Sequence, residues 1–220
     1  MFINRLESDV IEQLPVPNDG NRYVCLTLDD GPDPTYTPLV LDLLAKHNAK
    51  ATFFMIGKEL EKHGDTARRV RDEGHELANH TYTHPSIPTI TSLEVRAEVI
   101  RTAALLEAIT GKVDNLFRPP YGEYNDQNLR VLHDMGYRVV MWSEKLEMRD
   151  WESPGVDVLV EIALKEAFNG GIMLFHDGGG NHRMQTVEAL RIIVPRLTEQ
   201  GYRFVTVSHL LELCKPNEKK

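Results

Sequence analysis

The stretch that decides the fold is residues 23–32, which read Tyr-Val-Cys-Leu-Thr-Leu-Asp-Asp-Gly-Pro. Its first six residues are mostly apolar or β-branched and predict a buried strand. Two carboxylates and a Gly-Pro turn signal follow directly. In α/β folds with parallel strands, the carboxyl ends of the strands share one face. The stretch therefore predicts reactive side chains at one end of a parallel sheet.

Six further apolar or β-branched runs follow, each separated from the next by a helix-like or long polar segment. They span residues 51–56, 76–79, 116–118, 137–142, 171–175 and 203–207. Strands that alternate with helices predict a parallel sheet. About seven such units favour an α/β fold of the distorted (β/α) barrel type over an open doubly wound sheet.

Signals for the start and end of helices support this alternation. Thr37-Pro38 resembles an N-cap followed by a first-turn proline. Residues 91–94, Thr-Ser-Leu-Glu, fit a capping box that opens an amphipathic run ending at Gly111. The same glycine stop signal precedes three predicted strands, at Gly74, Gly136 and Gly201.

Length and composition predict one globular domain. The chain has 220 residues, 41% hydrophobic and 26% charged, which argues against disorder. We expect a catalytic domain at 23–214, an N-terminal extension at 1–22 and a polar tail at 215–220. Both terminal segments are polar and are expected to be peripheral.

The charge balance excludes several partners. Lys and Arg number 25 against 33 Asp and Glu, so the net charge of −8 lacks the basic excess that nucleic acid attracts. No apolar stretch has the length of a membrane span. We expect the protein to be a monomer. The first nine residues lack the apolar core of a secretion signal. We expect a cytoplasmic protein if Met1 is the natural start, and an extracellular or envelope protein if a leader has been removed.

Only two cysteines are present, Cys25 and Cys214. Two are too few for a disulfide framework, and they lack the spacing of a metal site. Buried thiols are the default interpretation. A single disulfide between them is the alternative.

A metal site is indicated by His80 and His84 together with the strand-end pair Asp29-Asp30. Histidines four apart lie on one side of a helical turn and can face one cation. Two imidazole nitrogens and one carboxylate oxygen suit Zn²⁺ and leave positions open for water and substrate. In isolation, the Asp pair is better explained as a capped turn, and the His pair fits solvated surface residues equally well. Their combination favours a metal.

Metal-assisted hydrolysis also needs a base for the water and an acid for the leaving group. The Asp that does not bind the metal would serve as base. His176 ends an apolar strand, and its imidazolium can protonate an amine near neutral pH. A His at this position can equally well hydrogen-bond a loop.

Two other strand ends carry candidate residues. The fixed charge of Arg118 could keep a carboxylate ionised, and the backbone N–H of Tyr121 could stabilise an oxyanion. Asp150 could orient a nearby His, and Trp151 could line an apolar subsite. The competing interpretations are a structural ion pair for Arg118, a solvated Asp150 and a core Trp151. No P-loop, dinucleotide fingerprint or G-x-S-x-G elbow is present.

Five ordered motifs within residues 23–211 resemble the polysaccharide deacetylases of carbohydrate esterase family 4, the NodB-homology domain. The motifs lie at residues 27–32, 79–85, 118–122, 150–151 and 174–176. The family fold is a distorted (β/α) barrel. The resemblance implies that Asp29 is the catalytic base and that Asp30, His80 and His84 bind a divalent metal, Zn²⁺ or a similar ion such as Co²⁺.

The resemblance also implies roles for the other candidates. Arg118 would fix the base, the Tyr121 amide would stabilise the oxyanion, and His176 would be the acid. Leu174 and Trp151 would line the pocket for the acetyl methyl group. The region between Trp142 and Trp151 is longer than usual, and Glu147 stands where an Asp is common, so the resemblance assigns Asp150 and Trp151 less directly than the metal ligands.

The expected function is removal of N-acetyl groups from N-acetylglucosamine residues in chitin-like or peptidoglycan glycans. An esterase acting on O-acetylated xylan is one alternative, and a catalytically silent glycan-binding module is another. Substrate choice is expected to depend on the loops after the strands, at residues 85–90, 123–126, 145–154 and 178–184.

Overall fold

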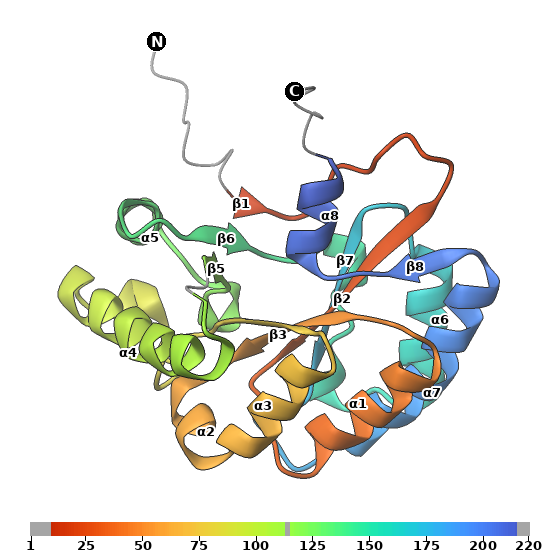
Figure 1. Ribbon diagram of the computed structural model, residues 1–220, viewed down its shortest axis with the longest axis horizontal. Coiled ribbons are helices and arrows are strands. Elements are labelled where there is room, and N and C mark those ends of the chain that lie inside the picture. Colours follow the sequence, from red (N-terminus) through yellow and green to blue (C-terminus); the bar gives the residue numbers. More distant parts are fainter. Residues whose placement is uncertain (1–9, 113–114, 215–220) are drawn as a thin grey trace.

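The computed structural model describes residues 10–112 and 115–214. Seven parallel strands form a sheet that curls into a half-barrel (Figure 1). They lie in the order β6-β5-β4-β3-β2-β7, with β8 beside β2. The predicted α/β barrel-like fold is confirmed. The strands are β2 (Arg22–Asp29), β3 (Ala51–Met55), β4 (Glu76–Asn79), β5 (Leu116–Phe117), β6 (Arg138–Val140), β7 (Gly171–His176) and β8 (Tyr202–Phe204).

Every predicted run overlaps its strand, but two strands end two or more residues earlier than expected. Within the run at 137–142, the strand β6 ends at Val140 because the Arg118 side chain donates to the carbonyls of Val140 and Met141. Within the run at 203–207, the strand β8 ends at Phe204 because Thr206 caps the next helix and accepts a hydrogen bond from the backbone N–H of His209. Side-chain partners of the backbone thus end both strands.

The described part of the N-terminal extension packs against the sheet. A two-residue strand, β1 (Val10–Ile11), pairs with β6, and Gln13 forms a bridge to Gly171 at the start of β7. Leu14 is buried, and its N–H donates to the carbonyl of Gly170 at 2.9 Å. Residues 10–14 are therefore not peripheral, contrary to the prediction. The domain boundary at residue 23 stays a prediction, and the polar tail lies outside the described residues.

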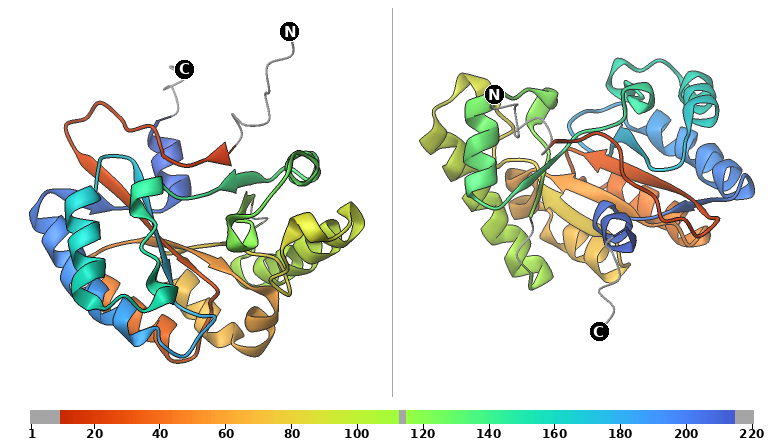
Figure 2. Two further views of the ribbon diagram at one scale, coloured as in Figure 1. Left: turned by 180° about the vertical axis from the view of Figure 1, so that it is seen from behind. Right: turned by 90° about the horizontal axis from the view of Figure 1, so that it is seen from above.

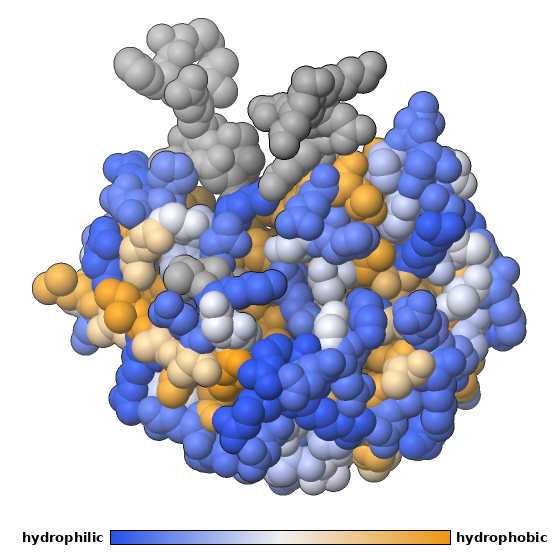
Figure 3. Space-filling model, in the orientation of Figure 1, coloured by the Kyte–Doolittle hydropathy of each residue, from blue (hydrophilic) through white to orange (hydrophobic). Residues whose placement is uncertain are grey.

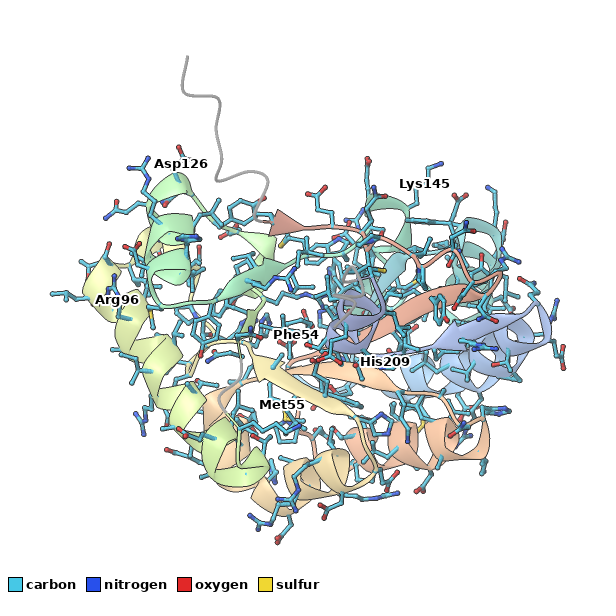
Figure 4. The ribbon with its side chains drawn as sticks, turned by 45° about the horizontal axis from the view of Figure 1, so that its top comes forward. Phe54, Met55, Arg96, Asp126, Lys145 and His209 are labelled. Carbon is cyan, nitrogen blue, oxygen red and sulfur yellow. The ribbon has the colours of Figure 1, made fainter. Side chains whose placement is uncertain are left out.

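Helices cover the outer face of the curled sheet (Figure 2). Along β3, Phe53 and Met55 pack with the helices, whereas Phe54, labelled in Figure 4, belongs to the core inside the barrel. This alternation follows from the twofold period of a strand. The helices are α1 (Tyr36–Lys46), α2 (Gly57–Lys62), α3 (Gly64–Asp72), α4 (Ser92–Thr110), α5 (Asp126–Asp134), α6 (Val156–Glu166), α7 (Met184–Glu199) and α8 (Val207–Leu213).

The predicted capping box at Thr91 is present, and α4 ends at Gly111 with a φ of 68°. The cap predicted at Thr37 is wrong. Helix α1 begins at Tyr36, two residues before the predicted first residue Pro38, and the Asp33 carboxylate accepts the backbone N–H groups of Thr35 and Tyr36. The Asp33 carboxylate, and not the Thr37 hydroxyl, therefore accepts the N–H groups at the start of the helix.

Helix α8 closes the amino-terminal end of the barrel. Val207 and Leu210 are buried in the inner core, and the N–H of Val207 donates to the Thr52 hydroxyl on β3. The opposite end, where the strands finish, is left for the candidate site. There Asp29 and His176 are register partners on the neighbouring strands β2 and β7.

The surface in Figure 3 is mainly hydrophilic, with a hydrophobic group at the left edge over α4, where Leu93 and Ile100 are exposed. Among the described residues, no helix is both long enough and apolar enough to span a bilayer. Both cysteines are free, Cys25 buried and Cys214 half-buried, so the alternative of a disulfide is not found.

Candidate metal centre and active site

Asp29 ends β2 and is held by a buried arginine. Arg118, with no exposed surface, donates from Nη1 to Asp29 Oδ1 at 2.7 Å and to the Thr27 hydroxyl at 2.8 Å. Burial lowers the pKa of the Arg118 guanidinium, and the charge of Asp29 opposes this effect. One carboxylate oxygen of Asp29 is thereby fixed, while Oδ2 faces His80 at 3.8 Å.

Asp30 faces the same centre as Asp29 because its left-handed backbone, with a φ of 74°, breaks the alternation of side chains along the strand. Its Oδ1 lies 3.2 Å from His84 Nε2 and 3.6 Å from His80 Nε2. Burial would raise the pKa of the Asp30 carboxyl, but the nearby imidazoles hold that pKa well below its usual range. Among the described residues, Asp30 Oδ1 is buried and lacks a hydrogen-bond donor.

The two histidines follow β4 in a loop, not on a helical turn as expected from their spacing. Thr81 and His84 have φ values of 65° and 63°, and His80 is the first residue after the strand. The His80 Nδ1 donates to the Arg118 carbonyl at 2.7 Å, since a carbonyl can only accept. In metal-bound histidines the second ring nitrogen typically donates to a carbonyl in this way, which orients the other nitrogen, here Nε2, toward the ion. Burial, reinforced by His80, lowers the pKa of His84 to about 4 and keeps it neutral.

These three side chains fit a divalent cation. One ligand atom from each of Asp30, His80 and His84 lies within 4.8 Å of the other two. Two imidazoles and one carboxylate whose Oδ1 lacks a donor form a ligand set that suits Zn²⁺ and related ions. The predicted ligands are thus brought together, and the identity of the ion stays a prediction.

His176 is paired with a fully buried carboxylate. Its Nδ1 donates to Asp150 Oδ1 at 2.7 Å, and Asp150 Oδ2 accepts from the His176 backbone N–H and the Thr186 hydroxyl. Burial works against the imidazolium, but the hydrogen bond and charge of Asp150 outweigh it, so the pKa of His176 is raised. Asp150 has no exposed surface, which excludes the interpretation of a solvated carboxylate.

A cavity of about 240 Å³ opens between these groups. Trp151 is 40% exposed, with its ring 5.1 Å from that of His176, so it is a wall residue and not a core residue. Tyr121 is exposed, has a φ of 60°, and stacks edge-on against His84. The cavity is lined by Asp29, Asp30, His80, His84, Tyr121, Gly122, Trp142, Glu147, Trp151, Leu174, His176 and Arg183.

Sequence reasoning gave no role to two buried groups beside the centre. Arg183 donates to the Gly178 carbonyl and places Nη2 4.0 Å from Asp30 Oδ2. Asp177 is fully buried and accepts a hydrogen bond from the Thr37 hydroxyl, and burial raises its pKa to about 7. The position of Asp177 directly after His176 was a signal for it. The position of Thr186, the third residue of α7, gave no sign of its contact with Asp150.

Known proteins resemble most of the chain. The family model for polysaccharide deacetylases matches residues 17–140. A peptidoglycan-N-acetylglucosamine deacetylase of Bacillus cereus is 45% identical over 196 residues, covering 89% of this chain and 91% of the relative. A chitooligosaccharide deacetylase of Sinorhizobium fredii is 36% identical over 204 residues, covering 88% of this chain and 94% of the relative.

Solved structures agree with these sequence matches. The Bc1960 peptidoglycan N-acetylglucosamine deacetylase superposes with a TM-score of 0.86 and 35% identity, covering 92% of each chain. A pseudoenzyme of carbohydrate esterase family 4 from Bacillus anthracis superposes with a TM-score of 0.80 and 31% identity, covering 92% of this chain and 68% of that one. A similar fold thus occurs with and without catalysis, and the site residues must distinguish the two.

Proposed function

Because the chain belongs to the polysaccharide deacetylase family, the NodB-homology family expected from its motifs, we propose that it hydrolyses the N-acetyl group of N-acetylglucosamine residues in glycans. A divalent ion held by Asp30, His80 and His84 would assist. One observation carries the proposal: the unpaired Asp30 oxygen faces two imidazoles in a cavity that Asp29 and His176 also line.

When bound, the ion would act as a Lewis acid that lowers the pKa of water and polarises a carbonyl. Asp29 is suited to accept the proton of the attacking water. Its Oδ1 is tied to Arg118, so the carboxylate keeps one orientation, and its Oδ2 is directed toward the centre.

His176 is suited to protonate the departing amine. Asp150 binds Nδ1, which leaves the Nε2 proton for transfer, and the raised pKa of His176 favours the imidazolium near neutral pH. The backbone N–H of Tyr121, at the mouth of the cavity, would donate to the oxyanion. The apolar surfaces of Leu174 and Trp151 would hold the acetyl methyl group.

The acid and base argue for catalysis and against a silent binding module. Each has a dedicated partner: buried Asp29 pairs with Arg118, and half-buried His176 pairs with Asp150. Glycan binding alone needs neither pair. The relatives that act on peptidoglycan and on chitooligosaccharides support N-acetylglucosamine as the sugar.

The test is acetate release by chelator-stripped protein with and without added Zn²⁺ or Co²⁺. N-acetyl chitooligosaccharides, peptidoglycan and O-acetylated xylan are compared as substrates. We expect metal-restored release from the first two. Asp29→Asn and His176→Ala should bind metal without turnover, whereas His80→Ala should lose the metal. Release from xylan only would favour the esterase, and turnover by Asp29→Asn would overturn the mechanism.

A further inference from the structure

Glu98 lies on α4, outside the cavity, yet its carboxylate binds the loop that carries both histidines. Its Oε2 accepts the backbone N–H groups of Tyr82 and Thr83 at 2.8 and 2.6 Å. Its Oε1 accepts the Thr83 hydroxyl at 2.8 Å. One side chain therefore satisfies two consecutive amides and a hydroxyl midway between His80 and His84.

Helix α2 binds the same loop from its other side. The first amides of this helix, Gly57 and Lys58, donate to the carbonyls of Thr81 and Tyr82 at 2.9 and 3.0 Å. A Cβ at Gly57 would lie 2.5 Å from the Tyr82 ring, so only glycine permits this approach. The loop backbone is clamped, with its carbonyls bound by α2 and its amides bound by Glu98.

The clamp spans an unfavourable backbone conformation. Thr81 and His84 both have a positive φ, which non-glycine residues adopt rarely and at a cost. Such a conformation persists only where surrounding contacts determine it. Here it sets the angle between the two imidazole rings, whose centroids are 4.9 Å apart.

We propose that Glu98 is a positioning residue for the metal centre, one that sets metal affinity without touching the ion. The inference rests on the proposed function, because it takes Asp30, His80 and His84 as the ligands. Hydrogen-bond partners behind metal ligands typically change metal affinity 10- to 100-fold when they are removed. Here the partner acts through the backbone between the ligands.

The loop has a second anchor that provides a control. The Tyr82 hydroxyl donates to Glu61 at 2.6 Å, and Arg101 lies over the Tyr82 ring at 3.4 Å. Both contacts stabilise the loop through a side chain and leave the backbone clamp in place. Tyr82→Phe therefore lowers stability without releasing the amides. Glu107, exposed on the same helix, provides a control for the loss of a carboxylate.

The experiment titrates chelator-stripped full-length variants with Zn²⁺ by calorimetry and with Co²⁺ by visible absorption, alongside thermal unfolding. Glu98→Ala should bind both ions about 10- to 100-fold more weakly. Glu98→Gln should stay within about threefold, because its amide oxygen still accepts both N–H groups. Glu98→Asp, which is one methylene too short for all three donors, should resemble the Ala variant and replaces it if that variant does not fold.

The outcomes separate the two proposals. If the wild type binds no Zn²⁺ at one equivalent, the metal site itself is wrong. If the wild type binds and folded Glu98→Ala and Glu98→Asp bind equally well, Glu98 has no positioning role. Equal weakening in Tyr82→Phe would show that general loop stability sets the affinity, which also overturns the proposal. Unchanged affinity in Tyr82→Phe and Glu107→Ala, with weakening only at Glu98, supports it.

Discussion

Replacing Arg118 by Met should destabilise the protein strongly, although Met fills similar apolar space. The guanidinium has no exposed surface and donates to Asp29, to the Thr27 hydroxyl and to the carbonyls of Val140 and Met141. Met satisfies none of them. The Asp29 carboxylate, 3% exposed, would remain as an uncompensated buried charge.

The magnitude follows from that charge. Removing one partner of a buried ion pair costs about 3–5 kcal/mol, a large share of the roughly 5–15 kcal/mol that stabilises a domain. For a chain of this size, each kcal/mol lowers Tm by about 2–4 °C, so the expected loss is about 6–20 °C. The exposed Arg130→Met variant should change stability by less than about 0.5 kcal/mol.

Urea and thermal unfolding of a double-mutant cycle test the cause. The single Arg118→Met variant leaves the Asp29 carboxylate buried without a partner, and adding Asp29→Asn removes that charge. The double variant should therefore be more stable than the sum of the two single losses predicts. If the losses in the free energy of unfolding are additive, an unpaired buried carboxylate is not the cause. Wild-type stability in Arg118→Met would refute the buried pair altogether.

Asp150→Asn removes the charge that, against the effect of burial, raises the pKa of His176. Since the acid must be protonated, the alkaline limb of the pH–turnover profile should move to lower pH, and an unchanged limb contradicts the pairing. Zn²⁺ at a hundred times its Kd should stabilise the protein by about 2.7 kcal/mol, or about 5–11 °C in Tm, and equal Tm values in Zn²⁺ and in chelator contradict a metal centre. Burial raises the pKa of the Cys25 thiol, so a thiol reagent should modify native protein at Cys214 first and reach Cys25 only on unfolding, as peptide mapping can check.

The fold could be predicted because its signals are local. Apolar runs, capping residues and stop glycines each depend on neighbours a few positions away, and the seven strands follow from them. One error arose from a competing group nearby, because the Asp33 carboxylate and not Thr37 accepts the first N–H groups of α1. The other arose from a distant contact, because β1 pairs with β6, which lies far away in the sequence.

The gathering of the candidate residues could also be predicted, because strand ends share one face. Their individual partners could not. Arg118 meets Asp29 across 89 residues, and His176 meets Asp150 across 26. Periodicity in sequence carries no information about such contacts, so the choice between a solvated and a paired Asp150 needed the structure.

By itself, the sequence determined a parallel, barrel-like sheet with acidic, histidine and arginine side chains at one end. It did so because alternating runs and turn residues act over short distances. Only the tertiary structure decided that the histidines stand on a strained loop and not on a helix, and that Glu98 of α4 binds that loop. Those features depend on hydrogen bonds to backbone amides of the loop. The residues that make these bonds come close to the loop only when the helices pack.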